Sequence, residues 1–334
     1  NALFLPLVLV LGVWRWFPFA SALRALGQHL RRTWGQYLLM VGVVVAFYWL
    51  VWPYLHEDPL RGLEYFRYIA SQGSRVGATG LTLQPVQMLL AVLPEGMLFL
   101  LLLGTAVAIF SRLSGAQPLL RLALAWLLVP LLRISLPGSA NFDGIRHYLE
   151  CLPAAALLAG FAAAWLVERA SRRGVVARAG MLVMLVLLIA MPVADGWQRY
   201  GVYQHVYFNR LVGGQARAAE IFGDSEASDY WGVTYRAGMN WLNRNAGSGA
   251  TLVTPVAPWL VELTAPVWLR GDIQVADLES PEAGGSERYV MLVTNSGARE
   301  ETLGGDCLDD PNPAYSLRVG GHAIMQICRL DGGG

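Results

Sequence analysis

The sequence has 334 residues, of which 55% are apolar and 15% charged, and its mean hydropathy is +0.42. These values lie outside the range of an ordinary soluble domain of this length, so the composition predicts an integral membrane protein. The net charge of +1 says nothing about nucleic acid, but no basic face with interleaved aromatic residues appears, so we expect no nucleic-acid partner. Every basic residue is an arginine, which we attribute to genomic composition bias rather than to a functional demand for guanidinium groups.

Long apolar runs recur along the first part of the chain and then stop. A spanning helix needs about 20 largely apolar residues. Beyond Asp195 the content of charged residues, Gly and Pro rises and no run is long enough to span. We therefore expect a polytopic α-helical membrane region over 1–194 and a separate extramembrane domain over 195–334. Six runs qualify as spans, roughly 2–19, 36–53, 86–111, 118–136, 148–167 and 179–194.

The arginines set the expected orientation, because short cytoplasmic loops collect basic residues. They gather in alternate loops, which places the other loops, 54–85 and 137–147, on the opposite side together with 195–334. The chain then begins on that opposite side without a signal-peptide pattern, so we expect it to continue an earlier membrane portion. The arginines that decide this are Arg24, Arg31, Arg32, Arg112, Arg121, Arg169, Arg172, Arg173 and Arg178.

The start of the expected extramembrane domain shows a helix followed by a strand. Ser228 or Asp229 can serve as N-cap of an aromatic-rich helix that runs to about Asn245. A Gly-containing stop follows, and then a short β-run at 250–254. This order is typical of an α/β domain.

The end of the domain reads as strands. The run 288–295 has the character of a buried strand, and the last stretch reads as a hairpin that turns at Gly320 and Gly321. We expect a small α/β domain whose sheet is covered by a helix. Cys307 and Cys328 both fall here, where a disulfide could persist, although their spacing does not decide whether they pair.

Motifs for common soluble chemistry are missing from the sequence. It contains no phosphate-cradling GxxxxGK[ST], no GxGxxG after a strand, no CxxC pair and no HExxH. Nucleotide and zinc chemistry are therefore disfavoured, and no cofactor or metal ligand is identifiable from these patterns.

The stretch SANFDGIRHYLECLP, residues 139–153, gathers charge just before the fifth apolar run. Arg146 offers a fork of donors and His147 one more, which suits a phosphate at the lipid boundary, while Asp143 can orient either. The first turn of a helix adds unpaired N–H groups and a favourable dipole. The alternative is that these residues cap the span and anchor it to lipid headgroups.

The other outer loop begins with a second charged group. We expect the start of loop 54–85 to fold toward loop 137–147 and to bring His56 or Glu57 near Arg146, because the two loops share a face and carry opposite charge. The alternative is a solvated loop start, with Asp229 acting only as a helix cap. The side chains that could line a cleft are His56, Glu57, Asp58, Asp229, Tyr230 and Arg236.

Three stretches resemble a known membrane family. The [FY]DGxRH element in NFDGIRHYLECLPAAALLAG, leading into a span that carries Pro153, resembles the late luminal or periplasmic loop of bacterial proteins similar to dolichyl-phosphate-mannose protein mannosyltransferases. VYFNRLVGG followed by DYWGVTYRAGMNWLNRNA resembles the juncture after the last span in that group. WPYLHEDPLRGLEYF resembles its amphipathic outer loop, and the three stretches lie in the expected order.

The resemblance implies a GT-C-like fold and a glycosyltransferase of the inner, cytoplasmic membrane whose C-terminal domain is periplasmic. Such enzymes take a sugar from a polyprenyl-phosphate donor at the outer face. Arg146 with His147 would stabilise the departing phosphate, Asp143 would orient Arg146, and the outer domain would select the acceptor. The family's catalytic acid lies in the first outer loop, upstream of Asn1, so the catalytic residue is unknown here. That missing part could also supply ligands for a divalent metal.

Two further readings stay open. In one, a fold derived from the GT-C class serves as a non-catalytic structural subunit of a larger membrane complex, with other membrane subunits as partners. In the other, the chain is a transporter, which is weakened because its apolar runs carry almost no ionisable residues away from their ends.

Overall fold

The computed structural model describes residues 19–51, 79–110, 117–139, 141, 143–276, 287–295 and 302–330, together with seven single positions between 56 and 71. Its internal contacts divide the chain into two units, each built from several segments. The first unit consists of Asn1–Pro85, Leu103–Asn141 and His147–Ala162. The second unit consists of Val86–Leu102, Phe142–Arg146 and Ala163–Gly334.

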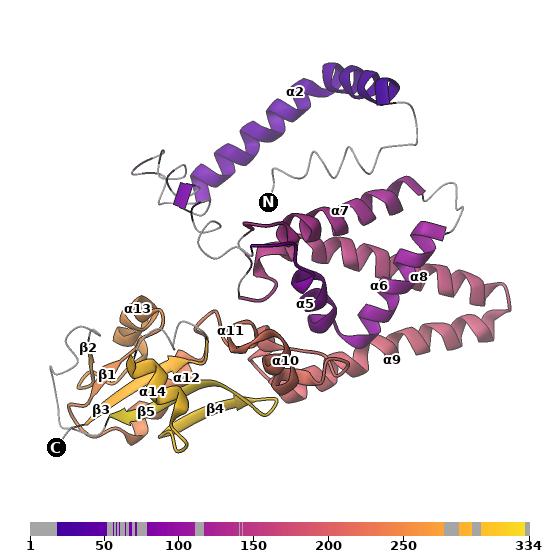
Figure 1. Cartoon of the computed structure of the whole chain (residues 1–334). Helices are drawn as coiled ribbons and strands as arrows, with labels where there is room; N and C mark the ends of the chain where they lie inside the picture. Colours follow the sequence, from indigo (N-terminus) through magenta and orange to yellow (C-terminus); the bar gives the residue numbers. More distant parts are fainter. Residues whose placement is uncertain are drawn as a thin grey trace. The chain divides into compact units, whose positions relative to one another are not determined.

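Long apolar helices make up the N-terminal part of the described chain (Figure 1). Within the described residues, four segments are long and apolar enough to cross a membrane, by length and composition: Arg31–Val51, Gln117–Ser135, Arg146–Ser171 and Val175–Tyr200. The helices of this part are α2 (Phe19–Val51), α5 (Gln84–Val92), α6 (Glu95–Phe110), α7 (Gln117–Ser135), α8 (Leu152–Ser171) and α9 (Val175–Tyr200).

Helix α9 leaves most of its apolar side chains exposed, which a soluble protein avoids on this scale. Only 6% of its most apolar window is buried. Val183, Val186 and Met191 are each more than half exposed. Such a surface is suited to lipid and supports a membrane location for these helices. Because α9 continues through residue 194 to Tyr200, the division of the chain at 194 stays a prediction.

The expected apolar runs match the helices unevenly. The run 118–136 corresponds to α7, and 2–19 lies almost wholly outside the described residues. The expectation of one uninterrupted helix over 86–111 is wrong, because α5 ends at Val92 and α6 begins at Glu95. Pro94 stands between them; it has no N–H to donate and disfavours helical geometry in the residue before it. The total number of spans stays a prediction.

Asn209 ties down the end of α5, whose last carbonyl groups have no partner within that helix. Its side-chain Nδ2 donates to the carbonyls of Leu90 and Leu93 at 2.7 and 2.9 Å, and its backbone N–H donates to Ala91 at 2.8 Å. Asn209 is 1% exposed. The carbonyl groups left without helical partners before Pro94 are therefore hydrogen-bonded by a residue from the segment after α9.

Two glycines of α6 permit close approach of neighbouring helices. A Cβ on Gly96 would lie 1.9 Å from the carbonyl oxygen of Leu188 in α9, and one on Gly104 would lie 2.0 Å from that of Leu158 in α8. No side chain can be accommodated at such distances. Small residues that let backbones touch are a general device of helix packing in membranes.

The C-terminal part of the second unit contains a five-stranded mixed sheet in the order β2-β1-β3-β5-β4 (Figure 1). Strand β1 runs parallel to β2 and β3, whereas β5 is antiparallel to both β3 and β4. The strands are β1 (Thr251–Val253), β2 (Gln274–Ala276), β3 (Arg288–Val293), β4 (Tyr315–Val319) and β5 (His322–Leu330). The helices around them are η3 (Gln204–Val206), α10 (Gly214–Phe222), α11 (Asp224–Ala227), α12 (Tyr235–Asn245), α13 (Pro258–Trp268) and α14 (Thr302–Asp309).

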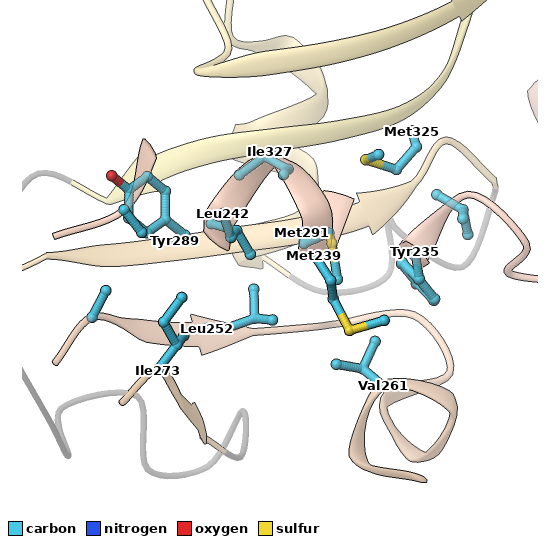
Figure 2. Packing of buried hydrophobic residues seen from close by; sticks show 13 residues of the cluster. Tyr235, Met239, Leu242, Leu252, Val261, Ile273, Tyr289, Met291, Met325 and Ile327 are labelled. Atoms are coloured by element: carbon cyan, nitrogen blue, oxygen red, sulfur yellow. The ribbon is translucent and has the colours of Figure 1, made fainter. Parts of the chain in front are cut away.

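Both faces of β3 are covered. On one face Met291 packs with Met239 and Leu242 of α12 in the main hydrophobic core (Figure 2). On the other face Val290 and Leu292 pack with Cys307 of α14 and Cys328 of β5, which form a disulfide. A strand buried on both faces reads as a continuous apolar run, which is why 288–295 was recognisable. The expected α/β domain is confirmed, with helices on two faces rather than one.

The hairpin expected at the C-terminal end is also confirmed. Strands β4 and β5 are joined at Gly320 and Gly321, whose φ angles are +56° and +86°. Consecutive positive φ values are what a tight two-residue hairpin turn requires, and glycine adopts them without steric cost.

Candidate functional site

The Asp-Gly pair at 143–144 forms a tight turn within the second unit. Both residues have positive φ, 59° at Asp143 and 69° at Gly144. Asp and Gly are the residues that tolerate this geometry best. A Cβ on Gly144 would lie 3.1 Å from the ring of Tyr230, so a side chain here would require that ring to shift by a few tenths of an ångström. Part of the [FY]DGxRH element therefore has a conformational origin.

The turn places Asp143 against Arg146. An oxygen of Asp143 lies 2.5 Å from Nη2 of Arg146, and the two side chains are 20% and 27% exposed. Burial raises the pKa of the Asp143 carboxyl, while the guanidinium of Arg146 opposes that rise. The expected contact between Asp143 and Arg146 is present.

Residues Arg146–Cys151 form a short 3-10 segment, η2, rather than the first turn of an α-helix. Tyr148 breaks it with φ −143°, and α8 begins only at Leu152. The expected position of Arg146 and His147 in the first α-helical turn is therefore wrong. The cause is Pro153, which has no N–H to donate to a carbonyl four residues earlier and is favoured where a helix starts.

In the first unit, the backbone around His147 is held by Arg133. Its Nη2 donates to the His147 carbonyl at 2.8 Å and lies 3.3 Å from Glu150. Arg133 sits in the last turn of α7. It thus links the end of α7 to the start of the following segment, and His147 contributes a backbone acceptor there.

Glu226 makes a contact with Gly144 that the sequence did not predict. Its Oε2 accepts the backbone N–H of Gly144 at 2.7 Å, and the residue is only 8% exposed. Burial raises the pKa of its carboxyl to about 7, opposed by the Gly144 amide and Arg146 and assisted by the charge of Asp143. The two residues are 82 positions apart. Nothing in the string GDSEASD marks this acid as different from its neighbours.

Asp229 is fully buried and organises the chain between α11 and α12. It accepts the N–H of Trp231 at 3.0 Å and of Thr234 at 2.7 Å, and Nε2 of His205 lies 3.0 Å from its Oδ1. Burial would raise the pKa of Asp229, but the hydrogen bonds from His205 and Thr234 outweigh it and lower the pKa.

The expectation that Ser228 or Asp229 caps the helix is wrong, because α12 begins at Tyr235 and Thr234 is its N-cap. Gly232, with φ +68°, turns the chain between Asp229 and that helix. The hydroxyl of Ser228 instead lies 3.0 Å from that of Thr294.

Tyr230 joins these groups. It packs against Gly144, and its ring meets that of His205 edge to face with centroids 6.4 Å apart. The candidate site is thus a cluster drawn from three segments of the second unit: Asp143, Gly144, Arg146, His205, Glu226, Asp229 and Tyr230. We call it the turn cluster.

Arg236 lies in a different place, a cleft of about 180 Å³. Its guanidinium stands 3.8 Å from the centroid of the Trp268 ring. Neither Asp229 nor Tyr230 lines this cleft, and the expectation that Arg236 lines a functional cleft stays a prediction. Its walls are Gly232, Val233, Tyr235, Arg236, Met239, Leu260, Thr264 and Trp268.

The first outer loop gives fewer contacts. Nε2 of His56 lies 2.5 Å from the Trp49 carbonyl, and Asp58 accepts the N–H of Leu60 at 2.9 Å. Glu57 lies outside the described residues, as does most of the expected amphipathic segment. The approach of His56 or Glu57 to Arg146 stays a prediction. Within the described part of the chain, no group of three His, Cys, Asp or Glu side chains is placed to hold a metal ion.

No protein-family model matches this chain, and no curated protein matches it either. What the turn cluster does is therefore inferred from its chemistry. It combines a partly exposed guanidinium with buried carboxylates next to a candidate span, an arrangement able to bind an anion through Arg146.

Proposed function

We propose that this chain is part of a membrane glycosyltransferase that transfers a sugar from a polyprenyl-phosphate donor at the outer membrane face. In this proposal Arg146 binds the donor phosphate, His147 assists and Asp143 orients the guanidinium. The observation that carries it is the position of Arg146, which begins the candidate span Arg146–Ser171 with its side chain held by Asp143 and 27% exposed. A cation held at the end of a span lies where lipid headgroups meet the hydrocarbon.

The chemistry proposed is an inverting transfer. A nucleophile of the acceptor attacks the anomeric carbon, the bond between that carbon and the phosphate oxygen breaks, and its electron pair leaves with the polyprenyl phosphate. The nucleophile's proton passes to a base, which the family resemblance places in the first outer loop of such enzymes. A fixed guanidinium stabilises the charge that develops on the leaving phosphate, and this contribution is largest where water is scarce.

Binding of a lipid phosphate tests this proposal. Farnesyl phosphate carries the phosphate and the isoprenoid without a sugar, so its affinity for the chain in lipid nanodiscs reports the phosphate site alone. Replacing Arg146 with Ala should weaken binding by about 1.5–3 kcal/mol, the usual worth of a hydrogen bond to a charged group, or roughly 10- to 150-fold.

Arg210→Ala is the matched control. Arg210 is also paired with an acid, Asp195, but is 64% exposed, and loss of an exposed pair costs well under about 1 kcal/mol. If Arg146→Ala and Arg210→Ala both bind farnesyl phosphate within twofold of the parent affinity, the turn cluster only anchors the helix and the proposal is wrong.

A second candidate function is a structural subunit of a larger membrane complex, built on a fold derived from the GT-C class. The observation that favours it is that the turn is held from within the chain: Asp143 pairs with Arg146, and Glu226 takes the Gly144 amide. Copurification of a stoichiometric membrane subunit, together with no farnesyl phosphate binding, would support this candidate over the first.

A further inference from the structure

The contact between Glu226 and Gly144 is the longest-range polar contact in the turn cluster. It joins α11 to the turn before η2 across 82 residues, at 2.7 Å, with Glu226 8% exposed. Tyr230 also packs against this glycine, since a Cβ on Gly144 would meet its ring at 3.1 Å. The turn therefore depends on one buried acceptor and one aromatic ring.

The charges around Glu226 do not balance. Asp143 and Arg146 act on it from the turn, and these two already form an ion pair with each other at 2.5 Å. On its own helix, Asp224 points elsewhere, toward His322 at 3.5 Å. Asp229, two residues past α11, is engaged with His205 at 3.0 Å, and Arg217 and Glu220 of α10 pair with each other. Among the described residues, an ionised Glu226 would thus place a second carboxylate beside the Asp143–Arg146 pair.

We propose that Glu226 is a positioning residue that holds the Asp143–Arg146 turn in place through the Gly144 amide, and that the closed turn is favoured when Glu226 takes up a proton. The Gly144 amide by itself favours the ionised carboxyl, but burial next to Asp143 outweighs that contact. The part that concerns phosphate binding rests on the function proposed above. The hold itself does not, because it depends only on groups within this chain.

The direction of the pH dependence follows from linkage. The pKa of Glu226 rises from its ordinary 4.5 to about 7 when it is buried against the turn. The closed turn therefore binds the proton more tightly than the open one. Stability of the closed form is full below about 4.5, falls as pH rises, and reaches its lower limit near 7. Between those values the open fraction should increase roughly tenfold per pH unit.

Hydrogen exchange of the Gly144 amide in the full chain, in nanodiscs, measures this directly. Rates are corrected for the intrinsic exchange rate at pH 5.0, 6.0, 7.0 and 8.0, and amides of α12 serve as an internal reference for domain integrity. In the parent, protection at Gly144 should fall by about tenfold per unit up to pH 7 and then level off. Protection that does not change with pH would overturn the proposal.

Three variants distinguish the contribution of Glu226 from that of Asp143. Glu226→Gln keeps an acceptor but cannot ionise, so its protection should stay constant over the range. Glu226→Ala removes the acceptor and should lose protection at every pH. Asp143→Asn should keep the pH dependence of Gly144 protection. If that dependence disappeared in Asp143→Asn and persisted in Glu226→Gln, Asp143 would be the proton acceptor and the inference would be refuted.

These outcomes are independent of the proposed function. No lipid phosphate is present in the exchange measurement, so a chain that binds no farnesyl phosphate can still show the Glu226-dependent slope. Conversely, a chain without that slope can still bind farnesyl phosphate through Arg146. Failure of the Glu226 inference and failure of the proposed function can therefore be told apart.

Discussion

Gly144 shows how a short motif can combine conformational and functional demands. Its φ of +69° alone favours glycine, and a Cβ there would lie only 3.1 Å from the Tyr230 ring. Asp143 also has positive φ and at the same time binds Arg146. The identity of the Asp-Gly pair therefore does not by itself indicate an anion site, and the proposal depends on Arg146 rather than on the turn.

Gly144→Ala tests these two constraints together, with Gly138→Ala as its control. Gly138 also has positive φ, +75°, but a Cβ there would have no neighbour within 4 Å. Both variants should lose about 1–2 kcal/mol from left-handed geometry, and Gly144→Ala about 1–3 kcal/mol more from overpacking against Tyr230. Thermal unfolding in detergent compares them. Equal midpoints for the two variants would show that Tyr230 does not constrain the turn.

At this scale the sequence predicted contacts between near neighbours. Asp143 and Arg146 are three residues apart, so their pairing could be anticipated from spacing. The contact of Glu226 with Gly144 depends on the tertiary fold, and no local pattern reports it. The residue type of Asp229 fits a helix cap, whereas its carboxyl accepts the N–H groups of Trp231 and Thr234 before α12 and lies 3.0 Å from Nε2 of His205.

At the scale of elements, strong periodicity and turn chemistry predicted structure well. The buried strand β3, the hairpin at Gly320–Gly321 and the end of α12 at Asn245 agree with expectation. Helix interruptions were harder to predict, because Pro94 and Pro153 lie within apolar runs where composition alone favours a continuous helix. Helices α13 and α14 and the three-residue strand β2 were not anticipated, since their residues show neither clear alternation nor a distinct helical stripe.

Asn209 provides an element-scale prediction, because it satisfies the carbonyls freed at the end of α5. Asn209→Asp keeps the shape but replaces the amide donor with a charge that faces two carbonyl oxygens. We expect a loss of about 2–4 kcal/mol, since it leaves buried acceptors unpaired and buries a charge. Asn245→Asp is the control, because Asn245 is exposed and bonds only to its own helix at 2.8 Å. Equal thermal midpoints for both variants would contradict this role.

At the scale of the whole molecule, the described residues combine four segments that are long and apolar enough to cross a membrane with a C-terminal α/β domain. The side on which each loop lies is a prediction from the arginines. The disulfide between Cys307 and Cys328 fits an oxidising compartment for the C-terminal domain. The number of spans and the placement of the N-terminal residues cannot be derived from local patterns alone, because helix breaks such as the one at Pro94 change the count.

Cysteine labelling tests the topology. Arg172→Cys places a thiol in the expected cytoplasmic loop, where the parent side chain is 74% exposed, and Ser248→Cys places one in the exposed part of the α/β domain. Cys151 is buried and the other two cysteines are paired, so the background should be low. A membrane-impermeant maleimide on intact cells should modify position 248 and spare 172. The reverse pattern would invert the topology.

The central claim, a polyprenyl-phosphate site at Arg146, is tested most directly by photo-crosslinking. A diazirine-bearing farnesyl phosphate would be activated in nanodiscs that contain the chain, and the modified peptides would be mapped. The account predicts modification within 141–151 that undecaprenyl phosphate competes away and that Arg146→Ala abolishes. Modification confined to the lipid-exposed sides of α8 and α9, unchanged by competitor and by Arg146→Ala, would contradict it.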